Sequence, residues 1–404
     1  MGSPAAVGVQ RYALNMSTTE SYTLKKSGKT RYRVRYRTVD NRPTVKSSFE
    51  TKEEADAWAA THLLAKRNGT ATSPARRKLL VGSFVQLHVD RTVGLSPSTI
   101  ANRQSIAGTW VLPDWADKTV GNAEKDGTAG VNTWIEKIAR ENAQPDTIQK
   151  AHGILLASLQ LAVGSRAIAV NPATGATLPK IVKRLHEYLT HEEVAELGAA
   201  IDPRWKTLIA VLAYCGLRFG ELSALRAGQV DLVTRRIHIV RSVTSVSGHM
   251  VEGLPKFHKL RKVYFPAFLD DAMASQLESK GRADLVFAAP RGGFVRLDDW
   301  RRRAFNQAKV ELNSDRAERA KATGLFVEPF PAITPHDLRH TAASLSVSAG
   351  ANIKALQIML GHASAAMTLD VYAELFDNDE ESVAIALHGQ AIGQISPSFW
   401  TPAS

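Results

Sequence analysis

The chain contains 404 residues, and its 51 Lys and Arg against 39 Asp and Glu give a formal charge of +12. A content of 44% hydrophobic and 22% charged residues is typical of soluble globular proteins and excludes a disordered or fibrous chain. The single cysteine, Cys215, excludes an internal disulfide and a cysteine-based zinc site. The longest apolar run, 208–217, has about half of the ~20 residues that a membrane span needs, and no export signal precedes it. These features predict a basic cytosolic protein.

Positive charge is concentrated near the N-terminus. Residues 1–80 contain 16 Lys and Arg against 6 Asp and Glu, whereas the remainder is almost balanced at 35 against 33. This asymmetry predicts a basic module that contacts nucleic acid, with a solubilising tail as the alternative. In the segment 31–37, arginines alternate with Tyr, Val and Tyr, and a period of two indicates a strand. A strand with arginines along one face can lie in a major groove of DNA.

The first two predicted domains differ in secondary structure. After a flexible leader, 1–21, short strand patterns and a helix capped by Thr51 predict a basic three-stranded sheet plus helix over 22–70. A basic linker, 71–78, then leads to a helical domain, 79–170. Two helix faces in this domain are predicted to be buried: Leu80, Phe84 and Leu87 form one, and Val131, Trp134, Ile135 and Ile138 form the other. The last helix is predicted from Asp146 to Ile168.

A third domain is predicted over 190–385, after a second linker, 171–189, and before a C-terminal tail, 386–404. Thr190 and Glu193 form the pattern of a capping box at its first helix. Helical patterns dominate it, apart from strand patterns between Arg236 and Pro266. The predicted fold class is therefore multidomain α+β.

Two motifs in this domain place basic residues at turns. Arg218 follows a buried apolar helix and Gly216, and Glu221 lies three residues further on, where it can hold the guanidinium. Taken alone, this pattern is more typical of an ordinary helix-end ion pair. Lys256 lies in an alternating apolar segment that predicts a hairpin, and taken alone it fits a solvated hairpin tip.

A third motif surrounds His336 and Arg339. Thr334 is a good N-cap and Asp337 completes a capping box, so the histidine and the arginine share a face in the first helical turn. An imidazole, a guanidinium and unpaired backbone N–H groups form the composition of a phosphate site. His336 and His340 also have the four-residue spacing of the two zinc ligands in a zinc-protease helix. However, Asp337 occupies the position where such a helix has Glu, and no third ligand is evident.

The fourth motif contains Gly361 as a helix C-cap, then His362, and then Tyr372 on a short helix. A tyrosine phenol has a pKa of ~10 and is a poor nucleophile unless cations stabilise the developing charge and a proton acceptor is near. No carboxylate cluster suited to Mg²⁺ is apparent, so side chains must supply the positive charge. Arg218 and Arg339 can each bind the non-bridging oxygens of a phosphodiester.

In content and order, these motifs resemble the tyrosine recombinases, the phage integrase family, over residues 190–385. The resemblance implies metal-independent and cofactor-free cleavage of DNA through a 3′-phosphotyrosine, in order to integrate and excise a phage or mobile element. It makes Glu221 a supporting residue and implies a catalytic set of Arg218, Lys256, His336, Arg339, His362 and Tyr372. Because Lys259 and Lys262 lie in the same hairpin, Lys256 is one of three candidate lysines.

The upstream domains resemble other parts of temperate-phage integrases. Residues 79–170 are similar to a helical core-site-binding domain, and residues 22–70 to an arm-site-binding domain. The implied partners are double-stranded DNA with core and arm sites, three further protomers in a homotetramer on DNA, an excision factor and a host DNA-bending protein, all in the host cytoplasm near the nucleoid. The expected DNA contacts are Arg31, Arg33, Arg35, Arg37, Arg76, Arg77, Lys78, Lys180, Lys183 and Arg184.

Other functions compete with this hypothesis. A type IB topoisomerase-like enzyme uses the same tyrosine chemistry, but the basic N-terminal module fits integration better. A chromosome-dimer-resolving recombinase resembles only the last two domains. A non-catalytic DNA-binding protein is the alternative outside the enzymes, although every expected catalytic position is filled.

Overall fold

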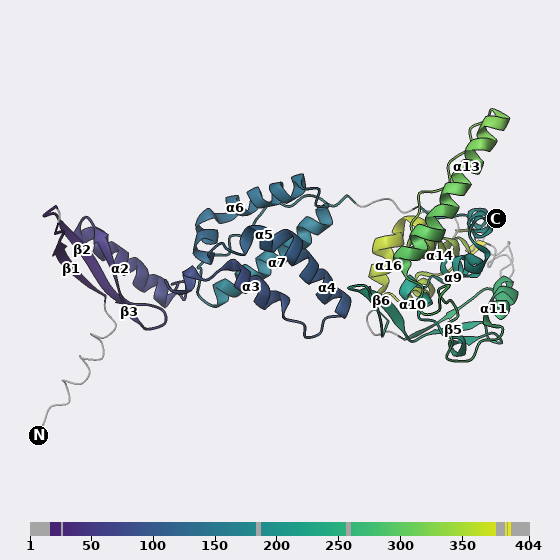
Figure 1. The fold of residues 1–404 in the computed structure, drawn as a ribbon, viewed down its shortest axis with the longest axis horizontal. Helices are drawn as coiled ribbons and strands as arrows, with labels where there is room; N and C mark the ends of the chain where they lie inside the picture. The colour runs from purple at the N-terminus through teal and green to yellow at the C-terminus, as the bar shows by residue number, and fades with distance from the viewer. Residues whose placement is uncertain are drawn as a thin grey trace, which may run out of the picture. The chain divides into compact units, whose positions relative to one another are not determined.

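The computed structural model describes residues 17–25, 27–182, 187–255, 260–376, 384–385 and 387–388. The chain divides into two compact units, 1–183 and 184–404, and the division falls inside the predicted linker 171–189 (Figure 1). Both the sheet region and the helical region that the sequence predicts upstream of this linker lie in the first unit. The mixture of helices and small sheets agrees with the predicted α+β class. Among the described residues, no helix has the length and apolar content that crossing a membrane requires.

The first unit begins with an antiparallel sheet in the order β1-β2-β3, formed by Thr18–Thr23, Thr30–Arg37 and Pro43–Phe49. Strand β1 starts at Thr18, so the sheet includes four residues that the sequence analysis assigned to the leader. Helix α2, Lys52–Arg67, follows, and the Thr51 side chain accepts a hydrogen bond from the Glu54 amide at 3.2 Å, as predicted.

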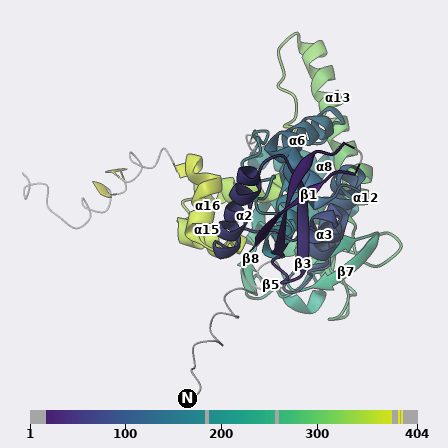
Figure 2. The same ribbon diagram turned by 90° about the vertical axis from the view of Figure 1, so that its left-hand side faces the viewer.

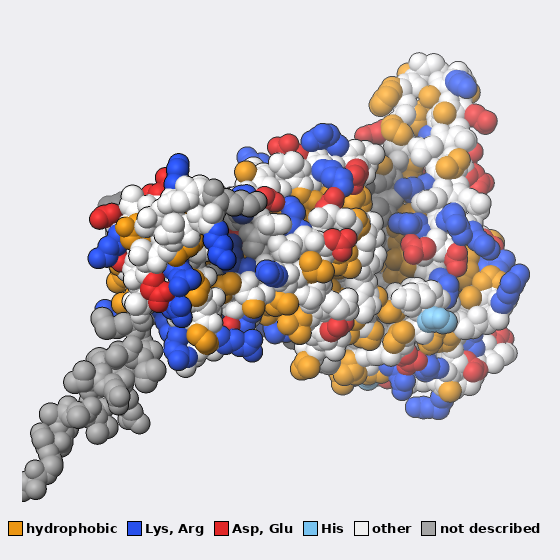
Figure 3. All heavy atoms as spheres, turned by 60° about the vertical axis from the view of Figure 1, so that its left-hand side comes forward, with side chains coloured by type: hydrophobic (Ala, Val, Ile, Leu, Met, Phe, Trp, Pro, Cys, Tyr) orange, Lys and Arg blue, Asp and Glu red, His pale blue; other side chains and the backbone are white. Residues whose placement is uncertain are grey.

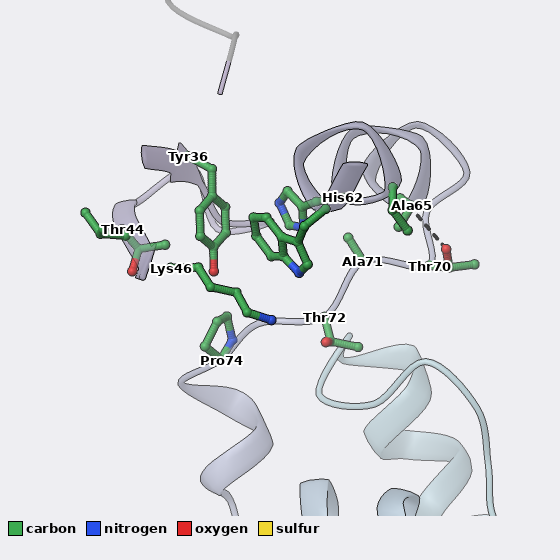
Figure 4. Close-up of a pocket in the computed structure, with 12 residues that line it drawn as sticks. Tyr36, Thr44, Lys46, His62, Ala65, Thr70, Ala71, Thr72 and Pro74 are labelled. Carbon is green, nitrogen blue, oxygen red and sulfur yellow. Dashed lines mark hydrogen bonds between the residues drawn. The ribbon is translucent and has the colours of Figure 1, made fainter. Parts of the chain in front are cut away.

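Helix α2 packs against β2 through aromatic rings. The Tyr36 ring lies 4.8 Å from that of Trp58 and 4.6 Å from that of His62. These rings line a cavity of about 520 Å³ between β2, β3, α2 and the segment 70–74 that follows the helix (Figure 4). The Lys46 ammonium lies 4.9 Å from the Trp58 ring centroid at this cavity. The helix is thereby held against the face of the sheet that carries Tyr36.

The rest of the first unit is helical, as predicted. Its elements are the 3-10 turn Arg76–Lys78, α3 (Val81–Val89), α4 (Pro97–Ile106), the π-turn Ala107–Val111, α5 (Leu112–Trp115), α6 (Val120–Arg140) and α7 (Pro145–Gly164). The predicted face of α6 is buried from Val131 to Ile138. Helix α7 ends four residues before Ile168, the predicted end.

The predicted face of α3 is wrong at two of its three positions. Phe84 is buried, but Leu80 and Leu87 are 42% and 50% exposed. The helix starts at Val81, and its buried face consists of Val81, Phe84, Val85 and Val89. The apolar stripe is therefore rotated from the predicted one, because the β-branched valines occupy the core.

The second unit starts with α8 (His191–Ala200), whose Thr190–Glu193 capping box is present as predicted. Helices α9 (Lys206–Cys215) and α10 (Phe219–Ser223) follow. The strands are β4 (Val230–Asp231), β5 (Arg236–Ile239), β6 (Ser242–Val246), β7 (His249–Gly253) and β8 (Arg261–Tyr264). They form one sheet in the order β4-β5-β8 and a separate β6-β7 hairpin. The strand patterns between Arg236 and Pro266 are thus confirmed.

The C-terminal half of this unit consists of α11 (Asp270–Leu277), α12 (Leu297–Trp300), the π-turn Arg301–Phe305, α13 (Asn306–Thr323), α14 (Asp337–Ser348), α15 (Ile353–Leu360) and α16 (Ala365–Tyr372). Helix α13 projects away from its unit in both ribbon views (Figures 1 and 2). Helices α15 and α16 lie side by side (Figure 2) and share a small core with Ala343 of α14. This core contains the side chain of Tyr372.

Candidate active site

The first part of the site is the turn between α9 and α10. Gly216 ends α9 in the left-handed conformation at φ 63°, and a Cβ there would lie 2.9 Å from Leu360 Cδ2. Only glycine allows both this backbone and this close approach to α15. Arg218 then takes the N-cap position of α10. Its amide donates to Glu221 Oε2 at 2.9 Å, and its Nη1 donates to Glu221 Oε1 at 3.1 Å.

Glu221 is buried between two arginines. Arg261, at the start of β8, donates from Nη1 to Glu221 Oε1 at 2.8 Å and from Nη2 to Oε2 at 2.7 Å. Burial raises the pKa of Glu221, but the hydrogen bonds and charges of Arg261 and Arg218 outweigh it, so this pKa lies below its usual range. Glu221 is therefore an ionised anchor that holds Arg218.

Arg339 is the second predicted arginine, and it is almost completely buried, at 3% exposure. Its Nη1 donates to the carbonyl oxygen of Gly216 and its Nη2 to that of Leu360. Burial and the nearby charge of Arg218 lower the pKa of Arg339 to about 9, so its guanidinium is charged at neutral pH. The guanidinium has five N–H donors, more than these two bonds require. Arg218 and Arg339 thus form one cationic cluster.

Two histidines at the start of α14, His336 and His340, lie in different surroundings. The helix begins at Asp337, two residues later than the predicted start, and Asp337 Oδ2 accepts from the Thr334 amide at 2.7 Å and from its hydroxyl at 2.8 Å. His336 precedes the helix and is exposed. The His340 ring packs edge to face against it at 5.0 Å. His340 itself is buried, and its Nδ1 lies 2.8 Å from the phenol oxygen of Tyr372.

Tyr372 is buried at the end of α16, with 1% of its surface exposed. Burial raises the pKa of its phenol to about 12, although Arg339 and Arg218 act in the opposite direction. Since the phenol is protonated at neutral pH, attack on phosphorus requires a proton acceptor. The imidazole of His340 is within hydrogen-bond reach of this phenol.

His362 is the second histidine ring beside the tyrosine. Gly361 ends α15 in the left-handed conformation at φ 64°, as predicted, and the His362 ring stacks over that of Tyr372 at 6.3 Å. Its Nδ1 is 3.0 Å from the Thr368 hydroxyl. Burial and the charges of Arg339, Arg218 and Arg261 lower its pKa to about 4, which keeps the ring neutral at pH 7.

The structure therefore brings together five of the six predicted catalytic residues, from four separate chain segments. They are Arg218, His336, Arg339, His362 and Tyr372. Lys256 and Lys259 lie outside the described residues. Two further residues of the site are not predicted from the sequence: Arg261 has no expected role, and His340 fits only the pattern of a zinc ligand. Arg261 lies two residues before the buried Val263 in β8, and this spacing indicates that its side chain points to the inner face of the strand.

The predicted arginine row lies on β2, where the contrast in burial is clear between Val34 and the exposed Arg35. Val34 is fully buried on the inner face, and Lys and Arg side chains are prominent on the surface of the β1–β3 region (Figure 3). Glu20 accepts ion pairs from Arg33 at 2.9 Å and from Arg35 at 2.8 Å. Arg31 pairs with Glu50 at 2.5 Å, and Arg37 donates to the carbonyl of Asn41. Ion pairs near the surface contribute little stability, and their exchange for DNA phosphates stays a prediction.

The basic linkers make contacts within the first unit. Arg76 pairs with Asp40 at 2.7 Å and donates to the Ser165 carbonyl at 2.5 Å, and Arg77 pairs with Glu124. These bonds fix the linker to its own unit. Lys78 and Lys180 are exposed, whereas Lys183 and Arg184 lie outside the described residues. Contacts of all these residues with DNA stay predictions.

The chain is similar to known integrases and tyrosine recombinases. The model of the phage integrase family matches residues 187–379. The integrase of Mycobacterium phage D29 is 24% identical over 352 residues, which cover 83% of this chain and 87% of the relative. The tyrosine recombinase XerC of Corynebacterium efficiens is 26% identical over 298 residues, which cover 70% of this chain and 83% of the relative.

Two solved structures share the fold. The Tn1549 transposon integrase, in complex with a circular intermediate DNA, gives a TM-score of 0.61 at 18% identity and covers 73% of this chain and 95% of its own. The match to the lambda integrase tetramer bound to a Holliday junction has a TM-score of 0.52 at 16% identity. It covers 85% of this chain and 96% of that chain. Together with the family match, these findings define a site-specific DNA recombinase. Residues 187–379 belong to the phage integrase family, and over most of its length the chain is similar to tyrosine recombinases.

Proposed function

We propose that the chain cuts and rejoins DNA through Tyr372, and that this reaction integrates and excises a phage or mobile element. The observation that supports this most directly is the position of the phenol, which bonds to His340, stacks with His362 and lies near the charges of Arg218 and Arg339. Two guanidiniums beside a tyrosine can neutralise the charge that develops on a phosphodiester without a metal ion.

In the proposed first step, the phenol oxygen attacks phosphorus, and the bond from phosphorus to the 5′-oxygen breaks. The phenol proton passes to His340, whose Nδ1 is 2.8 Å away. The leaving 5′-oxygen takes a proton from Lys256, the hairpin lysine that the family resemblance implies. Arg218, Arg339, His336 and the neutral His362 bind the phosphate oxygens. In the second step, a 5′-hydroxyl of the partner strand attacks the phosphotyrosine, its proton passes to Lys256, and the leaving Tyr372 takes back the proton held by His340.

The assembly follows from the same proposal. Four protomers hold two DNA duplexes, the region 22–70 binds arm sites, and the region 79–170 binds core sites together with the catalytic domain 190–385. The row Arg31, Arg33, Arg35 and Arg37 contacts arm-site phosphates and bases. An excision factor and a host bending protein set direction, and the reaction takes place on the nucleoid in the host cytoplasm.

Covalent trapping tests the proposal. A nicked suicide DNA with a candidate core site loses the short fragment after cleavage, so the phosphotyrosine adduct accumulates. We expect an adduct with wild type, none with Tyr372→Phe, and a normal yield with Tyr264→Phe, which changes an exposed tyrosine of β8. Binding without an adduct in wild type would support the non-catalytic alternative. An adduct with Tyr372→Phe would assign the nucleophile to another residue.

A further inference from the structure

Arg261 connects two turns of the site that are far apart in the sequence. On one side, its two terminal nitrogens bond both carboxylate oxygens of Glu221, at 2.8 and 2.7 Å. On the other side, its Nε donates to the carbonyl oxygen of Met359 at 3.0 Å. The side chain is 6% exposed, and Glu221 is completely buried. A flat guanidinium is the only side-chain group that can form these three bonds at once.

Gly361 shows how closely the second turn approaches this arginine. A Cβ built on Gly361 would lie 2.9 Å from Arg261 Cδ and 3.1 Å from its Nε and Nη1. The backbone of the turn therefore packs directly on the guanidinium. His362, which stacks over the Tyr372 ring, is the next residue.

Arg339 connects the same two turns by a different route. It bonds the carbonyl oxygens of Gly216 and Leu360, while Arg261 bonds Glu221 and the Met359 carbonyl. Two buried guanidiniums thus join the turn that carries Arg218 to the turn that carries His362. Arg339 also faces the site where a phosphate binds in the proposed reaction, whereas Arg261 acts only through other residues.

We propose that Arg261 is a positioning residue of the recombinase: by joining Glu221 to the Met359–Gly361 turn, it sets the place of Arg218 relative to His362 and Tyr372. This inference rests on the proposed function of Tyr372. A competing explanation is that Arg261 only neutralises the buried charge of Glu221. If Arg261 only neutralises Glu221, any positive charge at position 261 supports a normal reaction rate, whereas a positioning role also requires the shape of the guanidinium.

Arg261→Lys separates charge from geometry, because lysine keeps the positive charge but cannot bond both carboxylate oxygens and the Met359 carbonyl together. The measurement is the single-turnover rate of adduct formation on the nicked suicide DNA, with full-length protein at saturating concentration. This rate constant reports on folded molecules only. We expect a fall of about 10²-fold, the size expected for a small misplacement of a catalytic group, with DNA affinity within about threefold of wild type.

Two further variants make the test decisive. Val263→Ala removes buried bulk from the same strand without touching Glu221, and it serves as the control for lost stability. Arg261→Gln removes the charge as well and is expected to be at least as slow as Arg261→Lys. A wild-type rate in Arg261→Lys would overturn the inference, and so would an equal loss of rate in Val263→Ala. If wild type itself forms no adduct, the proposed function fails instead.

Discussion

The Nδ1 atom of His340 lies 2.8 Å from the phenol oxygen of Tyr372, which is 32 residues further along the chain. Both side chains are buried, so the bond joins the first turn of α14 to the end of α16 away from water. A buried hydroxyl that loses its hydrogen-bond partner costs free energy, so the pair stabilises the packing of α16 and fixes the position of the Tyr372 phenol.

A double-mutant cycle measures this pair. His340→Leu leaves the phenol unpaired and is expected to destabilise the second unit by about 1–3 kcal/mol. Because other contacts of His340 are lost as well, the informative quantity is its coupling with Tyr372→Phe, expected at about 1 kcal/mol. Urea titrations of the four proteins, followed by the accessibility of Cys215, give the coupling. Strictly additive effects would contradict the bond.

Cys215 is predicted to react with thiol reagents only after unfolding. It is the single cysteine, it is fully buried in the main core of the second unit, and burial raises its pKa to about 12. The reactive thiolate is therefore absent from the native protein at neutral pH. A disulfide reagent should label the chain in urea and leave it unlabelled in buffer, with Cys215→Ser as the blank. Fast labelling of the native protein would contradict this burial.

Gly361→Ala tests the close approach to Arg261. Alanine at φ 64° costs about 1–2 kcal/mol for the left-handed backbone, and its Cβ also meets the Arg261 side chain at 2.9 Å. Gly324→Ala is a matched control, because Gly324 ends α13 at φ 69° with nothing within 4 Å. We expect Gly361→Ala to lose more stability than the control and to slow adduct formation. Equal losses of stability in the two variants would show that the Arg261 side chain moves away from the new Cβ without a cost in free energy.

The stability of the second unit should depend on pH through His362. Its folded-state pKa of about 4 lies below the value of ~6.5 in an unfolded chain, so the unfolded state takes up the proton first as the pH falls. The contribution of this pKa difference to the free energy of unfolding is fully present above pH ~6.5 and is lost as the pH falls toward ~4. Between pH 7 and 5, wild type should therefore lose more unfolding free energy than His362→Gln. Parallel losses in urea titrations would contradict the assigned shift.

The arginine row of β2 predicts a salt effect. If Arg35 exchanges Glu20 for a phosphate of arm-site DNA, Arg35→Gln should reduce the slope of log affinity against log salt by about 0.9. Lys52→Gln, at the start of α2, is the control from outside the sheet. Binding isotherms at several salt concentrations on arm-site and core-site DNA provide the measurement. An unchanged slope on arm-site DNA would place Arg35 outside the interface.

Local sequence signals predicted the elements of the site well. The glycines at 216 and 361 indicated helix ends, and both adopt the left-handed backbone. Alternation predicted β2 with Val34 inside. Such features depend on neighbours a few residues apart, which is why they can be recognised in a single sequence.

Long-range partners could not be predicted in the same way. The bonds of Arg261 to Glu221 and of His340 to Tyr372 join residues 40 and 32 positions apart, and nothing in their local sequence specifies the partner. The prediction of the buried face of α3 was wrong for a different reason. Leucines and valines are both apolar, and the start of the helix at Val81 decided which of them faces the core.

The two carbonyl oxygens that bind Arg339 belong to Gly216 and Leu360, at the C-terminal ends of α9 and α15. Helix C-termini carry a partial negative charge of about half an electron each, from aligned peptide dipoles. In the DNA-free protein, the backbone therefore supplies an internal counter-anion for a guanidinium that would otherwise require solvent ions. Because this anion is part of the fold, the phosphate of the proposed reaction would meet a cation that is already in place, and its binding would need little reorganisation energy.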